Sequence, residues 1–240
     1  MSRNARLGLF GVSGVVLTAL LVWAFTGLPA FGTFNGEYGR ILNDVAGKER
    51  HVTNVVASVV FDYRGFDTLG EEFILFAAVM GVAMLLREAR DERERPRDEA
   101  RSDVVRAVGL ALAGPTVVVG LYLVAHGYLT PGGGFQGGVA VAGGLVLLYA
   151  AGRYRSYRAA SPHSLVELAE GTGAGAYAAV GVAALLAGAL YLQNVVQLGT
   201  KGSLNSGGTI PILNTAAGLE VAAALVLLFH EFLEEVMYPQ

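Results

Sequence analysis

The stretch that decides the fold is PTVVVGLYLVAHGYLTPGGGFQGGVAVAGGLVLLYAAG, residues 115–152. Two apolar runs flank a Gly-rich turn, and the only group in them that changes charge near neutral pH is His126. With the apolar residues that precede position 115, each run has about 20 residues and would span ~30 Å as a helix, the thickness of a bilayer's hydrocarbon core. The sequence therefore predicts two membrane-spanning helices joined by the turn. The turn consists of Thr130, Pro131, Gly132, Gly133, Gly134, Phe135, Gln136, Gly137 and Gly138.

The composition is that of an integral membrane protein. Of the 240 residues, 53% are hydrophobic and only 15% are charged, and the mean hydropathy is +0.50. A soluble domain has about 25% charged residues. The net charge of −3 gives no indication of a nucleic-acid partner. Because the chain has no cysteine, it forms neither a disulfide nor a thiolate metal site.

Six apolar runs are long enough to cross a bilayer, so we expect an all-α integral membrane protein with about six transmembrane helices. Their ranges are 7–25, 69–86, 105–127, 135–152, 173–192 and 212–232. The first run could instead belong to a signal peptide, but it is longer than the typical hydrophobic region of about 7–15 residues. We therefore interpret it as a retained span.

The distribution of lysine and arginine predicts that both termini are cytoplasmic. In this orientation twelve of the 17 basic residues lie in the inner segments and five lie in the outer loops, as the positive-inside rule requires. The Gly-rich turn between the third and fourth spans then faces outward. We expect a multi-pass protein of the cytoplasmic membrane.

Two segments between the spans have distinct characters. Residues 52–61 are apolar but too short to cross a bilayer, and Thr53 or Asn54 can cap a short helix there, so we expect a half-helix before the second span. Residues 87–106 are rich in charge, which is typical of a solvated cytoplasmic linker. The predicted organisation is a two-span module, 1–90, a linker, 91–104, and a four-span module, 105–240.

Acidic side chains gather near the start of the second predicted span, at Asp62, Asp67, Glu71 and Glu72. Asp67 and Glu71 are four residues apart and share a helix face if the helix includes both. Carboxylates near a membrane interior can bind a cation or pass a proton. The alternative is structural, because Thr68-Leu-Gly-Glu71 fits a capping box in which Glu71 bonds to the backbone. Asp67 and Glu72 have no place in that box, which favours ion transport.

Two further ionisable residues lie in or beside predicted spans. Glu220 is well inside the sixth span, where an unpaired carboxylate costs a few kcal/mol. It either belongs to an ion path or is a hydrogen-bonded group that packs the helix against a partner. His126 precedes the Gly-rich turn, where it is either a proton relay or, more commonly, an interfacial hydrogen-bonding group.

The Gly-rich turn is a poor candidate for a phosphate site. It lacks the Lys-Ser/Thr of a P-loop, follows no strand and faces away from cytoplasmic nucleotides. Its glycines and Pro131 favour close helix contact and irregular backbone, and Gln136 can supply a polar contact. We find no metal-ligand cluster, nucleophile elbow or hydrolase-like carboxylate pair, and expect neither a cofactor nor a resident metal.

Two stretches resemble a known family. HGYLTPGGGFQGG, residues 126–138, resembles the signature of the B subunit of Mrp/Mnh multisubunit sodium/proton antiporters, and related sequences occur in the membrane arms of membrane-bound hydrogenases. Tyr128 stands where that family commonly has a second histidine, so any role of that histidine is not carried over.

The second stretch, DYRGFDTLGEEFILFAAVMGVAMLLR with the preceding NVVASVVF, covers residues 54–87. It is similar to the carboxy-terminal end of the large A-type subunit of the same antiporters. Asp67 and Glu71 match the acidic positions of that motif, and the resemblance implicates them in ion transport. The chain thus resembles an E-type subunit of a hydrogenase membrane arm fused to a B-type antiporter subunit.

The resemblance implies a membrane subunit of a cation/proton antiporter, with Na⁺ and H⁺ as the transported ions, and not an enzyme. The expected partners are the other membrane subunits of a Mrp-type complex and the lipid bilayer. The candidate ion-path residues are Asp67, Glu71, Glu72, Glu220 and His126. Two alternatives remain open: a membrane-arm subunit of a hydrogenase or complex I-like redox-driven ion pump, and a purely structural subunit.

Overall fold

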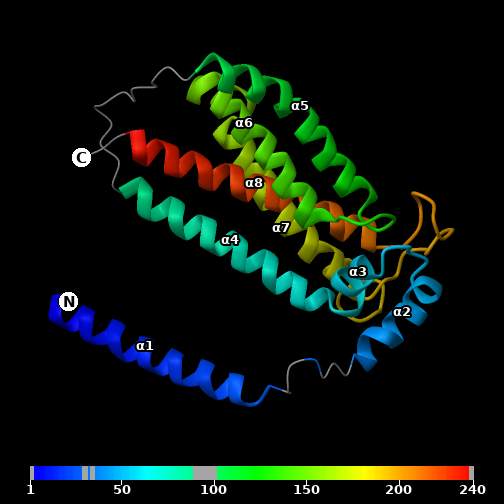
Figure 1. The fold of residues 1–240 in the computed structure, drawn as a ribbon. Coiled ribbons are helices and arrows are strands. Elements are labelled where there is room, and N and C mark those ends of the chain that lie inside the picture. Colours follow the sequence, from blue (N-terminus) through cyan, green and yellow to red (C-terminus); the bar gives the residue numbers. More distant parts are fainter. Residues whose placement is uncertain (1–2, 29–31, 33–35, 89–101, 238–240) are drawn as a thin grey trace. The chain divides into compact units, whose positions relative to one another are not determined.

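All the secondary structure in the described part of the chain is helical, which confirms the all-α prediction (Figure 1). The computed structural model describes residues 3–28, 32, 36–88 and 102–237. The chain divides into two units, Met1–Arg40 and Ile41–Gln240, which are described one at a time. The first unit contains α1 (Arg3–Thr26), whose apolar part is Phe10–Thr26.

The second unit is a helical bundle with a small capping region at one end. Its elements are most of α2 (Glu37–Glu49), α3 (Val55–Ser58), the π-helix η1 (Val59–Tyr63), α4 (Gly65–Glu88), α5 (Asp103–His126), α6 (Gly134–Ala160), α7 (His163–Leu186) and α8 (Ile210–Met237). Within the described residues, four segments are long and apolar enough to cross a bilayer: Gly65–Leu86, Asp103–His126, Gly134–Gly152 and Ile210–Leu233. A multi-pass membrane protein is therefore confirmed, and the crossings by α1 and α7 stay predictions.

The helix α8 is the centre of the bundle. It contacts α4, α5, α6 and α7, and Figure 1 shows it between α4 and the α5–α6 pair. Leu213, Ala217, Ala224 and Leu227 of α8 are completely buried. Because these small and aliphatic side chains face several neighbours, α8 can pack on all of them at once.

The helix α7 (His163–Leu186) begins ten residues earlier and ends six residues earlier than the predicted span 173–192, so both predicted boundaries were wrong. It runs antiparallel to α8, since His163 at its start contacts Glu231 near the end of α8. The helix ends at Leu186, and Gly188 follows with a φ of 78°, which a continuing helix does not allow. The apolar residues that follow belong to a loop, and the polar start of α7 belongs to the helix.

The predicted half-helix is present as α3 and η1, and its cap is Asn54. The Asn54 side chain accepts a hydrogen bond from the Val56 amide at 3.0 Å. The π-helical turn that follows has a wider backbone than an α-helix and is often found at functional sites. Of the predicted linker 91–104, residues 91–101 lie outside the described residues, and α5 begins after Ser102, whose hydroxyl accepts from the Val105 amide. The division into two modules stays a prediction.

The Gly-rich turn joins α5 to α6, as predicted, and asparagines from two other segments hold it. Asn214 of α8 accepts from the Gly134 amide at 2.7 Å and donates to the Val124 carbonyl at 2.6 Å. Asn54 donates to the carbonyls of Gly127 and Thr130, at 2.6 and 3.0 Å. These bonds satisfy backbone groups that the turn would otherwise leave unpaired.

Glycine is required in this region because backbones touch. A Cβ at Gly137 would lie 2.6 Å from the Gly120 carbonyl oxygen of α5, and a Cβ at Gly138 would lie 2.8 Å from the Gly218 carbonyl oxygen of α8. Such close contact is common between membrane helices that pack through small residues. The turn therefore determines how α6 fits between α5 and α8.

We expect Gly137→Ala to destabilise the bundle by about 1–3 kcal/mol, because the new methyl group forces α5 and α6 apart. Gly143→Ala in the same helix is the matched control, since a Cβ there meets nothing within 4 Å, and alanine is the better helix former. The measurement is thermal unfolding of the detergent-purified protein. Equal unfolding temperatures for the two variants would contradict the packing described for the turn.

Candidate functional site

Three glutamates from three helices are buried in the interior of the bundle. Glu72 of α4, Glu170 of α7 and Glu220 of α8 have exposed fractions of 0%, 1% and 0%. Glu72 and Glu170 each interact electrostatically with Glu220, so Glu220 is the member that the other two share. We call these three residues the carboxyl trio.

Gly173 of α7 lets α7 and α8 approach closely enough to bring Glu170 and Glu220 together. A Cβ at Gly173 of α7 would lie 2.6 Å from the Glu220 amide nitrogen and 2.7 Å from its Cβ, so the two backbones touch there. Glu170 is three residues before Gly173 and therefore lies on the same face of α7. Glu220 is ten residues into α8, ~15 Å along its axis, which places this contact near the middle of the span.

The carboxyls of Glu72 and Glu220 interact with each other, and among the described residues the trio lacks the basic and amide partners that structural carboxylates have. Both carboxyl oxygens of Glu72 and of Glu220, and Oε1 of Glu170, are buried without a hydrogen-bond partner among the described residues. An unpaired negative charge at membrane depth costs a few kcal/mol. A bound proton can remove that cost, whereas no three acidic or histidine side chains among the described residues are arranged to hold a metal ion. The chemistry available to the trio is therefore the uptake and release of a proton.

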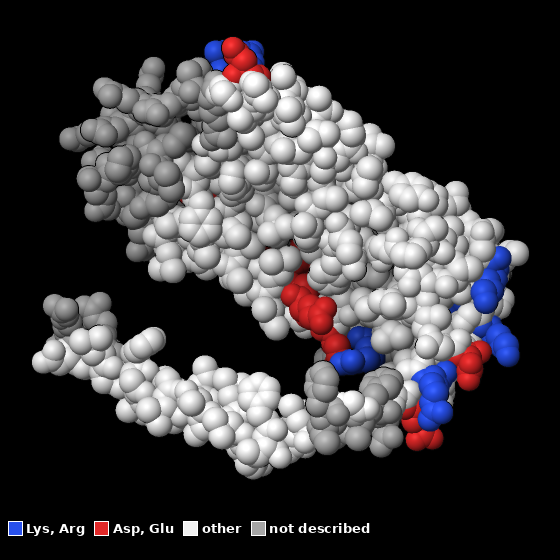
Figure 2. Space-filling view, in the orientation of Figure 1, with Lys and Arg blue, Asp and Glu red and all other residues white. Residues whose placement is uncertain are grey.

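Asp67 and Glu71 lie on the outside of α4, with Glu71 well along the span. The Arg64 guanidinium contacts the Asp67 carboxylate through Nη2 at 2.6 Å and Nε at 2.7 Å. Both side chains are more than half exposed, and Glu71 is also exposed. Figure 2 shows an acidic patch next to basic atoms on this face. Neighbouring residues Glu71 and Glu72 thus point to different sides of α4, one to its surface and one to the trio.

The predicted capping box at Thr68–Glu71 was wrong. The helix α4 already begins at Gly65, so Thr68 lies inside it. The Thr68 hydroxyl donates to the Val60 carbonyl of η1 at 2.7 Å and so connects the π-helix to α4. Because Glu71 lies six residues after the start of α4, it is too far from the first turn to have a capping role.

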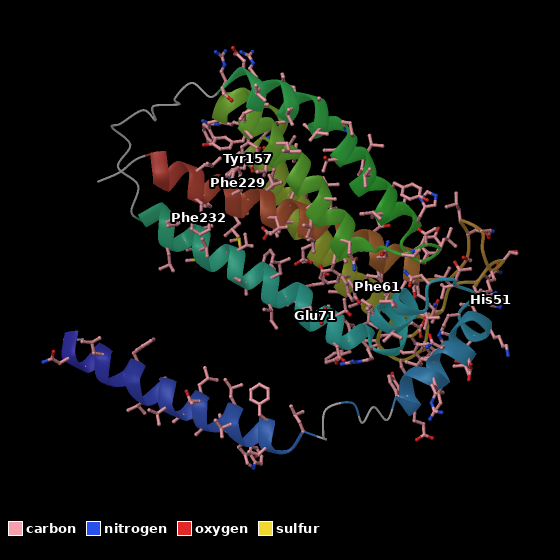
Figure 3. The ribbon with its side chains drawn as sticks, in the orientation of Figure 1. His51, Phe61, Glu71, Tyr157, Phe229 and Phe232 are labelled. Carbon is pink, nitrogen blue, oxygen red and sulfur yellow. The ribbon has the colours of Figure 1, made fainter. Side chains whose placement is uncertain are left out.

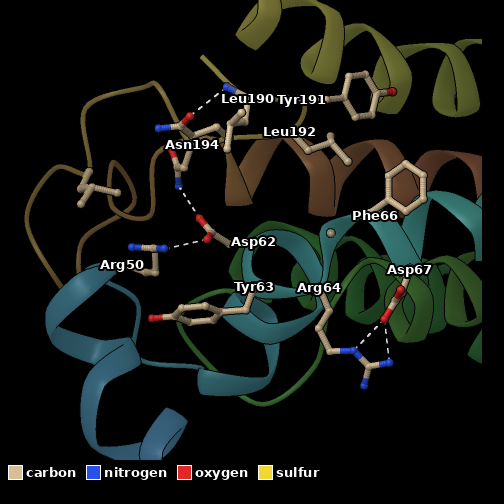
Figure 4. A pocket seen from close by; sticks show the side chains of 13 residues that line it. Arg50, Asp62, Tyr63, Arg64, Phe66, Asp67, Leu190, Tyr191, Leu192 and Asn194 are labelled. Carbon is tan, nitrogen blue, oxygen red and sulfur yellow. Dashed lines mark hydrogen bonds and ion pairs between the residues drawn. The ribbon is translucent and has the colours of Figure 1, made fainter.

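A polar pocket opens at the end of α4 where the chain leaves η1 (Figure 4). Its volume is about 520 Å³. The Arg50 guanidinium contacts one oxygen of the Asp62 carboxylate at 2.7 Å, and the Asn194 amide donates to the other at 3.1 Å. Asp67 and Tyr63 also line the pocket. The pocket connects the α2–α4 region to the loop that follows α7.

The charges in this pocket are fixed by their partners. Burial alone would lower the pKa of Arg50, but the hydrogen bond and the charge of Asp62 raise it above its ordinary value. Burial and the hydrogen bond that Tyr63 donates to Glu49 raise the pKa of Tyr63 to about 12. Arg50 therefore stays charged and Tyr63 stays a donor at neutral pH.

His126 lies at the end of α5, on a helix that does not carry any member of the trio. Its ring stacks on Tyr122 with centroids 4.3 Å apart, and Nδ1 lies 3.2 Å from the Tyr122 carbonyl oxygen. Tyr128, at the position where the resembled family commonly has a second histidine, is buried and donates to the Leu204 carbonyl at 2.6 Å. Burial raises the pKa of Tyr128, so it keeps the proton that it donates.

Glu170 is the member of the trio that the sequence did not reveal. The predicted span began at residue 173, so Glu170 lay outside it. Its position next to the small-residue run Gly-Thr-Gly-Ala-Gly, 171–175, was the available signal, because small residues in a span indicate close helix packing. Among the described residues, no group of three or more His, Cys, Asp or Glu side chains is arranged to hold a metal ion.

Two families match the chain, one for each half. Residues 104–227 match the family described as a domain related to the MnhB subunit of Na⁺/H⁺ antiporters, and residues 3–102 match the family described as the E-type subunit of MBH (MbhE). An uncharacterized protein of Methanocaldococcus jannaschii is 30% identical over 200 residues, which are 72% of this chain and 74% of the relative. A probable K⁺/H⁺ antiporter A/B subunit of Rhizobium meliloti is 32% identical over 126 residues, which are 43% of this chain but only 13% of that relative.

Two solved complexes contain chains of similar structure. A chain of the membrane-bound sulfane sulfur reductase, an archaeal respiratory membrane complex, has a TM-score of 0.72 and 29% identity, with 98% of this chain and 100% of that chain covered. A chain of the Mrp complex from Dietzia sp. DQ12-45-1b has a TM-score of 0.65 and 25% identity, with 96% of this chain and 26% of that chain covered.

If the trio serves ion chemistry at the expense of stability, removing one carboxyl should stabilise the fold. We expect Glu220→Met to stabilise the protein by about 1–4 kcal/mol, since a flexible apolar side chain replaces an unpaired buried carboxyl. The matched control is Glu231→Met in the same helix, which should destabilise it because His163 loses its partner at 3.1 Å. Thermal unfolding in detergent measures both. Destabilisation by Glu220→Met would mean that this carboxyl has a structural role.

Proposed function

Because the chain belongs to the family of membrane proteins related to the MnhB subunit of Na⁺/H⁺ antiporters, we propose that it is one subunit of a multisubunit cation/proton antiporter. In this proposal it acts in secondary transport and exchanges Na⁺ against H⁺ together with the other membrane subunits of the complex. The carboxyl trio of Glu72, Glu170 and Glu220 forms part of the ion path.

The observation that carries this proposal is the absence of basic and amide partners around the trio within the described residues. Two other acids among the described residues that have little or no exposure are paired: Asp62 contacts Arg50 and Asn194, and Glu231 contacts His163. A protein that needed three interior carboxyls only for packing would gain stability by pairing them or replacing them. Unpaired acids at membrane depth are instead typical of proton and cation relays.

Asp67 and Glu71 extend the path toward the neighbouring subunits. Glu71 is six residues after the start of α4, ~9 Å along its axis, and its side chain is exposed. A charged group at that depth is too costly against lipid, so another subunit or a wet cavity covers it. Ions would then pass between the covered surface of α4 and the trio by way of adjacent residues Glu71 and Glu72.

In a second candidate function, this chain is the corresponding membrane subunit of a redox-driven ion pump. The similarity to a chain of a respiratory membrane complex, which is covered over its whole length, favours it. The two candidates differ in what is attached to the membrane subunits. Affinity purification through this chain, followed by identification of the co-purified subunits and measurement of their iron content, separates an antiporter from a redox complex.

We expect Glu72→Gln and Glu220→Gln to lower cation-dependent proton flux by about a hundredfold, the lower end of the contribution of a positioned proton-transfer group. The assay uses membrane vesicles that contain the whole complex, with Na⁺ and K⁺ tested separately. Asp103→Asn is the control, because Asp103 is an exposed acid at the start of α5.

The double variant Asp67→Asn, Glu71→Gln tests the surface part of the path in the same vesicles. We expect a loss of flux with normal assembly, since both changes are isosteric and both side chains are exposed. If the trio variants and this double variant assemble normally and transport at the control rate, the ion path is rejected and the chain has only a structural role in the complex.

A further inference from the structure

A second group of titratable side chains lies where α7 begins and α8 ends, at the end of the bundle away from the Gly-rich turn. The His163 ring of α7 contacts Glu231 of α8 through Nε2 at 3.1 Å and Glu167 of α7 through Nδ1 at 3.5 Å. His230 of α8 is next to it, with ring centroids 5.9 Å apart. The aromatic residues Tyr154 and Tyr157 of α6 pack against His230. Figure 3 places Tyr157 and Phe229 at this end, and His51, Phe61 and Glu71 at the other.

Exposure changes steeply across this group. The side chains of Glu167 and His163 are 41% and 28% exposed, whereas that of Glu231 is completely buried. The imidazole of His163 thus bonds on one nitrogen to a carboxylate at the surface and on the other to a carboxylate in the interior. An imidazole with both nitrogens bonded in this way can accept a proton on one side and release one on the other.

His230 is less suited than His163 to pass a proton between the surface and the interior. Its Nε2 lies 2.8 Å from the Ser161 carbonyl oxygen, which can only accept, so this nitrogen carries a hydrogen and donates it there. The ring is buried against Tyr157, whose hydroxyl donates to the Val226 carbonyl. The contacts of His230 therefore hold the end of α6 to α8, while His163 connects the surface to the interior.

The helix geometry aligns this group with the carboxyl trio. Along α7, Glu167 and Glu170 are four and seven residues after His163, and so all three lie on one face. Along α8, Glu231 is eleven residues, about three turns, after Glu220. Ionisable groups therefore follow α7 from the middle of the bundle to the surface at this end, whereas on α8 the buried apolar residues Ala224 and Leu227 lie between Glu220 and Glu231.

We propose that His163, paired with Glu231, is the proton-exchange group that connects the carboxyl trio to the water at the predicted cytoplasmic end. This proposal rests on the proposed function of the trio. In the step, Nδ1 of the neutral imidazole, whose hydrogen is on Nε2, takes up a proton from the side of Glu167, where water is accessible. The Nε2–H bond of the resulting imidazolium then breaks and an O–H bond forms on the Glu231 carboxylate. The ring is left with its hydrogen on Nδ1, and a change of tautomer returns it to the starting state. One proton moves inward for each proton taken up.

The test measures cation-driven proton flux in vesicles that hold the whole complex, with the pH varied on one side at a time. In the unmodified complex, flux depends on the pH at the His163 side, because that side supplies the proton to the imidazole. His163→Gln is expected to remove that dependence and to lower the flux at least threefold. Imidazole added on that side should restore the flux, and imidazole on the other side should not.

Two further variants separate a proton-exchange role from a structural one. Glu231→Gln should change the pH profile, because Nε2 of His163 loses the carboxylate that accepts its proton. His51→Asn, at the opposite end of the bundle, is the control and should keep the profile of the unmodified complex. Asparagine suits the left-handed backbone of that position, where φ is 54°.

The outcomes distinguish this proposal from the one on which it rests. If Glu220→Gln abolishes flux while His163→Gln keeps the full pH profile and shows no effect of imidazole, the role of His163 is overturned and the trio's role stands. If Glu220→Gln transports normally, the ion path through the trio fails. A His163→Gln complex that does not assemble leaves Glu231→Gln as the deciding variant, and an unchanged profile in it overturns the proposal.

Discussion

The contact between the backbones of α7 and α8, at Gly173 and Glu220, is the constraint on which the interior of this protein depends. Because glycine has no side chain, α7 lies directly against the part of α8 that carries a carboxyl group in mid-span. Glu170 then enters the same interior, and α4 completes it with Glu72. A larger side chain at position 173 would separate the helices, so one small residue determines both the packing and the arrangement of the acids.

The polar groups of the bundle are arranged differently at its end and in its middle. Around the Gly-rich turn, Asn54 and Asn214 satisfy backbone groups of α5 and α6, and Asp62 has two partners. These bonds hold the loops that connect the helices. In the middle, the trio lacks such bonds among the described residues and contributes no comparable stabilisation. Functional sites often reduce stability, and the rest of the fold compensates for them. Here the hydrogen bonds at the end of the bundle stabilise the fold, and the trio in its middle does not.

The boundary that the sequence suggests at the charged segment 87–106 does not divide the packing. The helix α4, before this segment, contacts α8 and α7, which follow it. Asn54 bonds to the Gly-rich turn across more than seventy residues of sequence. Residues 41–240 accordingly form a single unit, although the two halves match different families. The trio needs both halves, because Glu72 comes from the first and Glu170 and Glu220 come from the second.

The sequence by itself determined the class of the protein, the all-α membrane fold, the Gly-rich turn between α5 and α6, and the depth of Glu220, because apolar length and turn residues are local properties. It placed Asp67, Glu71 and Glu72 in one acidic segment but could not say that Glu72 faces inward and the other two outward. The tertiary structure decided that, together with the register of α7 and the membership of Glu170. These depend on which helices touch, and contacts between residues one hundred positions apart leave no periodic pattern in a single sequence.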